Sequence, residues 1–268
     1  MVAAGSEVWA ASPTTGVLVR LSGDGEVRRI QLRGAPISLA LTPATLWVAE
    51  RDAERVVAVG TSSLAQTSST MVPLPAAAIA GAQGVWVLSL DAGSLDQLNP
   101  RTGAIGRELD VPVSKPVAVV EAAGELWVLG AGEQGLSPIN PAVGGSVRAG
   151  FDQRGAALSG LSAGGGAIWL GETSGRSILR VNATSGNVRK LPAPDGMRPV
   201  AISVGECGVW IAGASGEVTI IDPQSASPLT PPIHVGRSIG AIAASGAGVW
   251  VSDPLNGDLV RIELRATA

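Results

Sequence analysis

The sequence predicts an all-β fold, a seven-bladed β-propeller built of four-stranded antiparallel blades. Three observations carry this prediction: an even spacing of tryptophans, a strand-like string around each of them, and a turn residue that follows each at a nearly constant distance. The tryptophans are separated by 38 to 42 residues, which is the period of a propeller blade. They are Trp9, Trp47, Trp86, Trp127, Trp169, Trp210 and Trp250.

The strings around the tryptophans are apolar at consecutive positions, as in TLWVAE, AIWLGE and GVWVSD. Continuous apolar runs are typical of strands that are covered on both faces, here by neighbouring blades. A β-sandwich would alternate polar and apolar residues and show no fixed register, and a leucine-rich solenoid has a period of about 20–29 residues. Both alternatives are excluded, and the tryptophans are predicted to be core residues rather than a stacking platform for a ligand.

Turn residues follow the tryptophans in register. Several of these residues are Asn or Asp, whose side chains form local hydrogen bonds to the main chain and favour tight turns. The position lies thirteen residues after the tryptophan in six repeats and twelve in the other, and is occupied by Ser22, Gly60, Asn99, Asn140, Asn182, Asp222 and Glu263. A proline, which suits the first residue of a strand, lies eleven residues before four of the tryptophans, at Pro36, Pro75, Pro116 and Pro199.

Each repeat therefore predicts four strands, and we expect one domain over residues 1–268. The first repeat begins inside its inner strand, and the last ends after its third. We expect the outermost strand of the last blade to be missing from this chain, and a preceding segment of a longer protein to supply it. The expected blades are approximately 1–33, 34–74, 75–114, 115–154, 155–196, 197–237 and 238–268.

Composition restricts the class of partner. The net charge is −3 over 268 residues with both signs interspersed, which does not favour nucleic acid. No apolar stretch is long enough to span a bilayer, so we expect no membrane insertion by this chain. The single cysteine, Cys207, has no partner for an internal disulfide.

The loops between strands are the expected binding surface, because propellers place two sets of them on one face around a central funnel. One set, entering the inner strands, carries basic residues that suggest a site for a carboxylate, a phosphate or an acidic peptide. The alternative is that these charges are solvated and neutralised by the acidic residues of the second loop set. The basic residues are Arg33, Lys115, Arg154, Arg198 and Arg237.

Acidic residues in the second loop set offer another chemistry. Glu50, Glu172 and Asp253 each lie three residues after a tryptophan, which would suit a hard cation only if their oxygens were clustered. They belong to separate blades, so no metal or other cofactor is predicted. The only histidine, His234, falls on a predicted outer strand, and tyrosine is absent, which leaves no catalytic residue to predict.

The strings PVAVVEAAGELWVLG and SILRVNATSGNVRKL resemble the YncE-like, NHL-like and virginiamycin B lyase propellers. WD40 repeats are less similar, because their Gly-His and Trp-Asp signatures do not occur. Virginiamycin B lyases use a histidine, a glutamate and a metal, and the sole histidine here is misplaced for that role. NHL-like propellers form extracytoplasmic sensor domains of bacterial receptor-type serine/threonine kinases.

The missing closing strand and the recurring basic loop residues, together with the resemblance to NHL-like propellers, lead us to expect a non-enzymatic ligand- or protein-binding propeller, an extracytoplasmic sensor or interaction domain of a larger bacterial protein. The expected ligand is an anionic small molecule or peptide, or a protein partner, at the funnel face. Two alternatives remain open. One is a metal-dependent lyase or hydrolase of virginiamycin B lyase or gluconolactonase type working through Glu50, Glu172 or Asp253; the other is a structural scaffold for protein partners.

Overall fold

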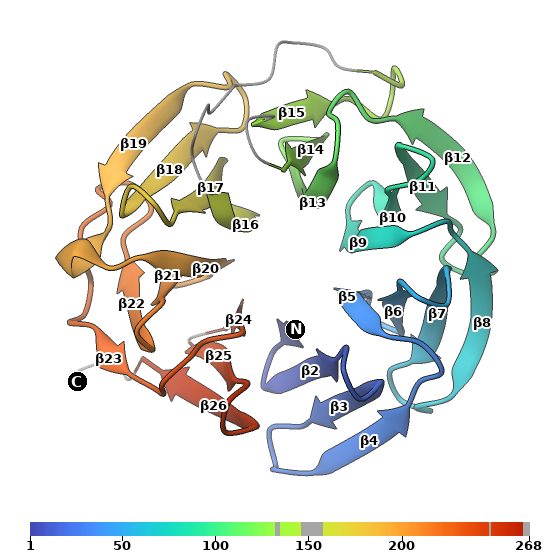
Figure 1. Cartoon of the computed structure of the whole chain (residues 1–268), viewed down its shortest axis with the longest axis horizontal. Coiled ribbons are helices and arrows are strands. Elements are labelled where there is room, and N and C mark those ends of the chain that lie inside the picture. Colours follow the sequence, from blue (N-terminus) through green and yellow to red (C-terminus); the bar gives the residue numbers. More distant parts are fainter. Residues whose placement is uncertain (132–134, 146–157, 247, 265–268) are drawn as a thin grey trace. The chain divides into compact units, whose positions relative to one another are not determined.

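The computed structural model describes residues 1–131, 135–145, 158–246 and 248–264. Their strands form seven separate sheets, labelled in Figure 1. The chain divides into two compact units, one of Met1–Val2 with Trp9–Asp152 and one of Ala3–Val8 with Gln153–Ala268. Within the described residues the regular structure is β-strand apart from one short 3₁₀ turn, η2 (Pro194–Gly196).

Each sheet is one sequence repeat whose strands follow one another from inner to outer. The first three sheets are β1 (Val2–Ala4), β2 (Glu7–Ser12), β3 (Val17–Leu21) and β4 (Val27–Gln31); β5 (Pro36–Leu41), β6 (Thr45–Glu50), β7 (Arg55–Gly60) and β8 (Gln66–Met71); and β9 (Pro75–Gly81), β10 (Gly84–Ser89), β11 (Ser94–Leu98) and β12 (Ile105–Asp110). The fourth holds β13 (Pro116–Ala122), β14 (Glu125–Gly130) and β15 (Leu136–Ile139).

The remaining sheets repeat this order. They are β16 (Leu158–Gly164), β17 (Ala167–Glu172), β18 (Ser177–Asn182) and β19 (Val188–Pro192); β20 (Pro199–Gly205), β21 (Gly208–Gly213), β22 (Glu217–Ile221) and β23 (Ile233–His234); and β24 (Ala241–Ser245), β25 (Gly248–Asp253) and β26 (Asp258–Glu263). The predicted fold class is confirmed: the sheets are antiparallel propeller blades, and the last blade has three strands among the described residues.

The tryptophan strands are buried on both faces, as their unbroken apolar pattern predicts. In β10, Val85 and Val87 pack in a cluster with residues of the second blade, whereas Trp86 and Leu88 pack with residues of the fourth. In β21 the same alternation holds between the fifth and seventh blades. All seven tryptophans are at most 6% exposed, so they belong to the packing between blades.

Four of the predicted turn residues, Asn99, Asn140, Asn182 and Asp222, form side-chain hydrogen bonds in the turn after the third strand of their blade. Asn99 Oδ1 accepts the main-chain N–H groups of Arg101 (2.9 Å) and Thr102 (3.1 Å). Asn140, Asn182 and Asp222 accept main-chain N–H groups two or three residues ahead in the same way. These bonds satisfy donors that the turn removes from the sheet.

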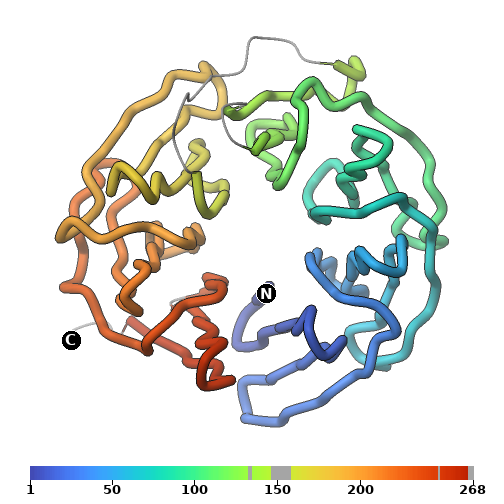
Figure 2. Tube along the Cα trace, in the orientation of Figure 1, coloured from blue at the N-terminus to red at the C-terminus, as the bar shows by residue number. Residues whose placement is uncertain are grey.

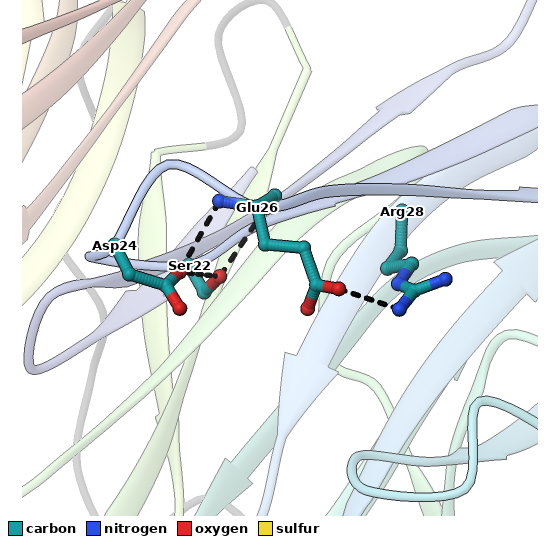
Figure 3. A network of polar contacts seen from close by, with 4 residues as sticks. All are labelled: Ser22, Asp24, Glu26 and Arg28. Atoms are coloured by element: carbon teal, nitrogen blue, oxygen red, sulfur yellow. Dashed lines mark hydrogen bonds and ion pairs between the residues drawn. The ribbon is translucent and has the colours of Figure 1, made fainter.

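The first blade closes its outer hairpin with a different network, drawn in Figure 3. The Ser22 hydroxyl donates to Asp24 Oδ1 over 2.6 Å, and the Glu26 main-chain N–H donates to the same oxygen over 3.2 Å. Beyond it, Arg28 Nη2 forms an ion pair with Glu26 Oε1 at 2.5 Å. The bond from Ser22, followed by that from Glu26, lowers the pKa of Asp24. All four residues thus serve local turn structure.

Four inner strands begin at the predicted prolines: β5, β9, β13 and β20. In all four the register shifts directly after the proline, between Pro36 and Ser38, Pro75 and Ala77, Pro116 and Ala118, and Pro199 and Ala201. A proline has no N–H to give to the sheet, and the first position of a strand is where that loss costs least. No helix in the described ranges is long and apolar enough to cross a membrane.

Candidate functional site: the crossover end of the blades

The two predicted loop sets lie at the same end of each blade, which we call the crossover end. Here the chain crosses from an outer strand to the next inner strand, and the hairpin between second and third strands turns back (Figure 2). In four blades a main-chain N–H of the hairpin donates to a crossover carbonyl. These pairs are Arg51 to Ala35 (3.2 Å), Leu90 to Leu74 (3.1 Å), Ala131 to Lys115 (2.9 Å) and Ala214 to Arg198 (2.9 Å). The crossovers are therefore held in place by their own backbone.

The predicted basic residues that the structure describes are exposed at this end. Arg33, Lys115, Arg198 and Arg237 all point to solvent, and their side chains make no hydrogen bond or ion pair with any described residue. Arg154 lies outside the described residues. The first unit holds Arg33 and Lys115, and the second holds Arg198 and Arg237.

Arg176 joins Arg198 at one crossover in the second unit. Its Nη1 donates to the carbonyl of Gly196 over 3.2 Å, so the side chain reaches from the β17–β18 hairpin to the loop just before Arg198. The same loop contains η2 and Asp195, whose φ of 48° is left-handed. This crossover therefore carries two guanidinium groups and one exposed carboxylate. Sequence position alone does not indicate that Arg176 bridges the two loops.

Glu50 is fully buried at the end of β6. Its Oε2 accepts from Arg55 Nε over 2.6 Å, while its Oε1 has no hydrogen-bond partner among the described residues. The backbone of the preceding crossover lies directly against it, since a Cβ on Gly34 would be 3.0 Å from the Glu50 Cβ. Glu50 is thus the acidic half of an internal ion pair beneath the loop that carries Arg33.

Glu172, at the equivalent position of the fifth blade, is 6% exposed and also paired. Its Oε2 lies 2.5 Å from Lys190 Nζ and accepts a short hydrogen bond from the Ser177 hydroxyl. The hydrogen bond from Lys190, and then the one from Ser177, lower the pKa of Glu172 despite its burial. The carboxylate at the end of β17 is therefore held in its charged form by one residue of β18 and one of β19.

Asp253 closes the last β25–β26 hairpin instead of facing a ligand site. Its Oδ1 accepts the main-chain N–H groups of Leu255 (3.0 Å) and Asn256 (3.3 Å), and its Oδ2 accepts from Asn256 Nδ2 (2.8 Å). Gly236 fits against it, because a Cβ there would be 2.3 Å from Asp253 Oδ2. Asp253 is 3% exposed and lies beneath the crossover that carries Arg237.

Glu217 belongs to the same set of carboxylates but was not predicted. It begins β22, where its carboxylate occupies space over Gly213: a Cβ on that glycine would meet Glu217 Oε1 at 2.0 Å. Its Oε2 is buried without a hydrogen-bond partner among the described residues. The sequence does contain one signal for it. Gly213 lies three residues after Trp210, where other blades carry Glu50, Glu172 or Asp253, and the small glycine leaves room for an acidic side chain from the next strand.

Glu50, Glu172 and Asp253 lie on separate blades, and each is bonded to neighbours within its own blade. Among the described residues no three His, Cys, Asp or Glu side chains are grouped to hold a metal ion. His234 lies exposed on β23, the outer strand on which it was predicted, and Cys207 lies exposed in the turn before β21. The exposed side chains at this end include the crossover residues Arg33, Lys115, Arg198 and Arg237 and the carboxylate of Asp195.

No protein-family model and no curated protein sequence matches the chain. Solved structures do. Virginiamycin B lyase from Staphylococcus aureus, in a catalytically inactive form with quinupristin, is 17% identical over 99% of this chain and 94% of its own, with a TM-score of 0.82. Kuenenia stuttgartiensis hydrazine synthase is 15% identical over 98% and 94%, with a TM-score of 0.84. The WD40 propeller domain of Doa1 is 14% identical over 98% and 90%, with a TM-score of 0.77. At these identities the likeness establishes the propeller fold alone.

Proposed function

We propose that this propeller is a non-enzymatic binding domain whose crossover end takes an anionic ligand. The observation that supports it is the set of exposed basic side chains, without a partner in the described part of the chain, on crossovers whose backbone is hydrogen-bonded in place. In the second unit these are Arg198 and Arg237, with Arg176 beside Arg198. A guanidinium on an ordered loop loses less freedom on binding than one on an unstructured segment.

The ligand class that fits best is an acidic peptide segment. A single ion pair at an exposed site contributes only about 0.2–1 kcal/mol, so one carboxylate on one arginine would bind weakly. Several carboxylates on one chain can engage several crossovers at once, and their contributions combine. Glu50, Glu172 and Asp253 are bonded to partners within their own blades and do not neutralise the crossover arginines, which leaves those arginines available to an external anion.

We assign this domain to sensing or interaction outside the cytoplasm, as part of a larger bacterial protein such as a receptor-type serine/threonine kinase. The support is the resemblance of its repeats to NHL-like propellers. Propellers similar in fold also occur in protein assemblies, such as the structure of the mitotic checkpoint complex, 11% identical with a TM-score of 0.79. A protein partner that presents an acidic segment is consistent with a sensor domain and with a role in a protein assembly.

A synthetic oligoglutamate peptide tests the binding proposal. We expect it to bind the wild-type chain saturably at low ionic strength, and we expect the double variant R198A/R237A to bind roughly tenfold more weakly. The matched control is R29A/R101A, which removes two exposed arginines from outer parts of the first and third blades. Equal weakening in both double variants would show a general charge effect and would overturn the site.

The alternative is a metal-dependent lyase, favoured by the fold it shares with virginiamycin B lyase. The residues available for a metal are Glu50, Glu172 and Asp253, and their oxygens are bonded within separate blades. That arrangement does not fit a shared cation. Mass-spectrometric metal analysis of purified protein separates the two functions, because a stoichiometric divalent ion that is lost in the E172Q variant would favour the lyase.

A further inference from the structure

Three blades carry the same row of side chains, in which a tryptophan on the second strand faces an arginine on the third. The guanidinium carbon lies 5.5–5.7 Å from the ring centroid in each pair, which is within the range of a cation–π contact. The pairs are Trp9 with Arg20, Trp169 with Arg180, and Trp250 with Arg261. In the first and fifth blades a second arginine extends the row on the outer strand.

The extended rows place two arginines directly opposite each other. Arg20 pairs with Arg28 across β3 and β4, and Arg180 pairs with Arg189 across β18 and β19. Like charges in directly opposite positions of an antiparallel pair destabilise the sheet, because their Cβ atoms are only about 4.5–5.5 Å apart. Such a pair needs a compensating negative charge.

In two of the three rows a glutamate forms an ion pair with one of the arginines. In the first blade Arg28 Nη2 lies 2.5 Å from Glu26 Oε1, as Figure 3 shows. In the last blade Arg261 Nη2 lies 2.7 Å from Glu263 Oε1. Each glutamate is two residues from its arginine in sequence: Glu26 lies just before β4, and Glu263 ends β26.

The fifth blade lacks both acids. Asn187 and Asn182 occupy the positions that correspond to Glu26 and Glu263, and the Asn182 oxygen already accepts the N–H groups of Thr184 and Ser185. Lys190, next to Arg189, is paired with Glu172. The charges of Arg180 and Arg189 are therefore uncompensated among the described residues.

The Arg180 guanidinium also has an unused donor. Its Nε is buried and has no hydrogen-bond partner in the described part of the chain. Because this N–H of a charged group is buried without an acceptor, the guanidinium is poorly compensated, and an external anion that reaches its Nη donors would stabilise it. The Arg180 guanidinium carbon lies 5.6 Å from the Trp169 ring centroid, and the exposed Arg189 is the residue directly opposite Arg180 on the outer strand.

We infer that Arg180 and Arg189 form a binding site for a doubly charged oxyanion, phosphate or a phosphate monoester. Two facing guanidinium groups supply several N–H donors for tetrahedral oxygens, and a dianion cancels both positive charges. Because the site uses outer strands of one blade and none of the crossover arginines, it is independent of the proposed peptide-binding function.

The test is a titration of ¹⁵N-labelled protein with sodium phosphate at constant ionic strength, following the side-chain Nε–H signal of Arg180 and the indole signal of Trp169. We expect a saturable shift in the wild type. We expect R189Q to weaken phosphate binding at least about tenfold. The matched control R28Q removes the equivalent arginine of the compensated row and should leave the Arg180 response unchanged, as should R198A/R237A.

The outcomes separate the possible sources of the anion. If phenyl phosphate binds about tenfold more tightly than inorganic phosphate, the site serves a phosphate monoester; equal or weaker binding assigns it to the free oxyanion. A non-saturating shift that is the same in wild type and R189Q would overturn the site, since it would reflect screening alone. Acetate that binds as tightly as phosphate would overturn the ligand class.

Discussion

Replacement of Arg55 by methionine should strongly destabilise the second blade. Glu50 is 0% exposed, and Arg55 Nε at 2.6 Å is its hydrogen-bonding partner among the described residues. Removing one member of a buried pair typically costs about 3–5 kcal/mol, because the remaining charge has no compensation. The Arg55 side chain is 17% exposed, so water can reach the pair, and we expect a loss of about 3 kcal/mol, the lower end of that range.

Urea unfolding of the wild type, R55M and the double variant E50L/R55M measures this effect as a shift in the midpoint. The double variant should lie within about 1 kcal/mol of the wild type, because two apolar side chains of similar length can replace a buried ion pair. A loss below about 1 kcal/mol in R55M would refute the interpretation of Glu50 as a buried, dependent charge. So would a double variant as unstable as R55M itself.

Three further predictions concern buried polar groups and close packing. Burial raises the pKa of Asp96, so its charged form opposes folding. The D96N variant should therefore be more stable than the wild type at neutral pH. The difference between their urea midpoints should shrink as the pH falls through the raised pKa toward the ordinary value. The pKa of Glu172 is lowered, chiefly by the hydrogen bond from Lys190, so the charged carboxylate stabilises the fold above its ordinary pKa, and this stabilisation is lost as the pH falls through the lowered pKa. The K190M variant should therefore show a weaker loss of thermal midpoint in acid. A Cβ at Gly160 would lie 2.6 Å from the Ile202 main-chain nitrogen at a φ of 61°, so G160A should lose about 1–3 kcal/mol in urea unfolding; an unchanged midpoint would contradict this packing.

The repeat could be predicted because its signals are local. Trp86 lies between apolar neighbours that face opposite blades, and Asn99 closes a turn through its own side chain; both effects operate within a few residues of the chain. The prolines that begin inner strands are predictable for the same reason, since they act on their own backbone.

The partners of the carboxylates could not be predicted, because they depend on contacts across strands. Glu172 and Lys190 are far apart in sequence and meet only once the register of the fifth blade is fixed. Glu217 was not predicted, because its carboxylate occupies the space over Gly213 on the adjacent strand. For Arg198 and Arg237 the sequence identified the loops, whereas their exposure and lack of partners required the structure.

Amide chemical-shift mapping of the oligoglutamate complex tests the central claim most directly. If the crossover end is the binding surface, the largest saturable shifts will fall at residues 193–198 and 235–240, and raising the salt concentration will reduce them, as expected for exposed charges. Shifts spread evenly over exposed basic residues, with those two loops no more affected than the hairpins at the opposite ends of the strands, would contradict the account.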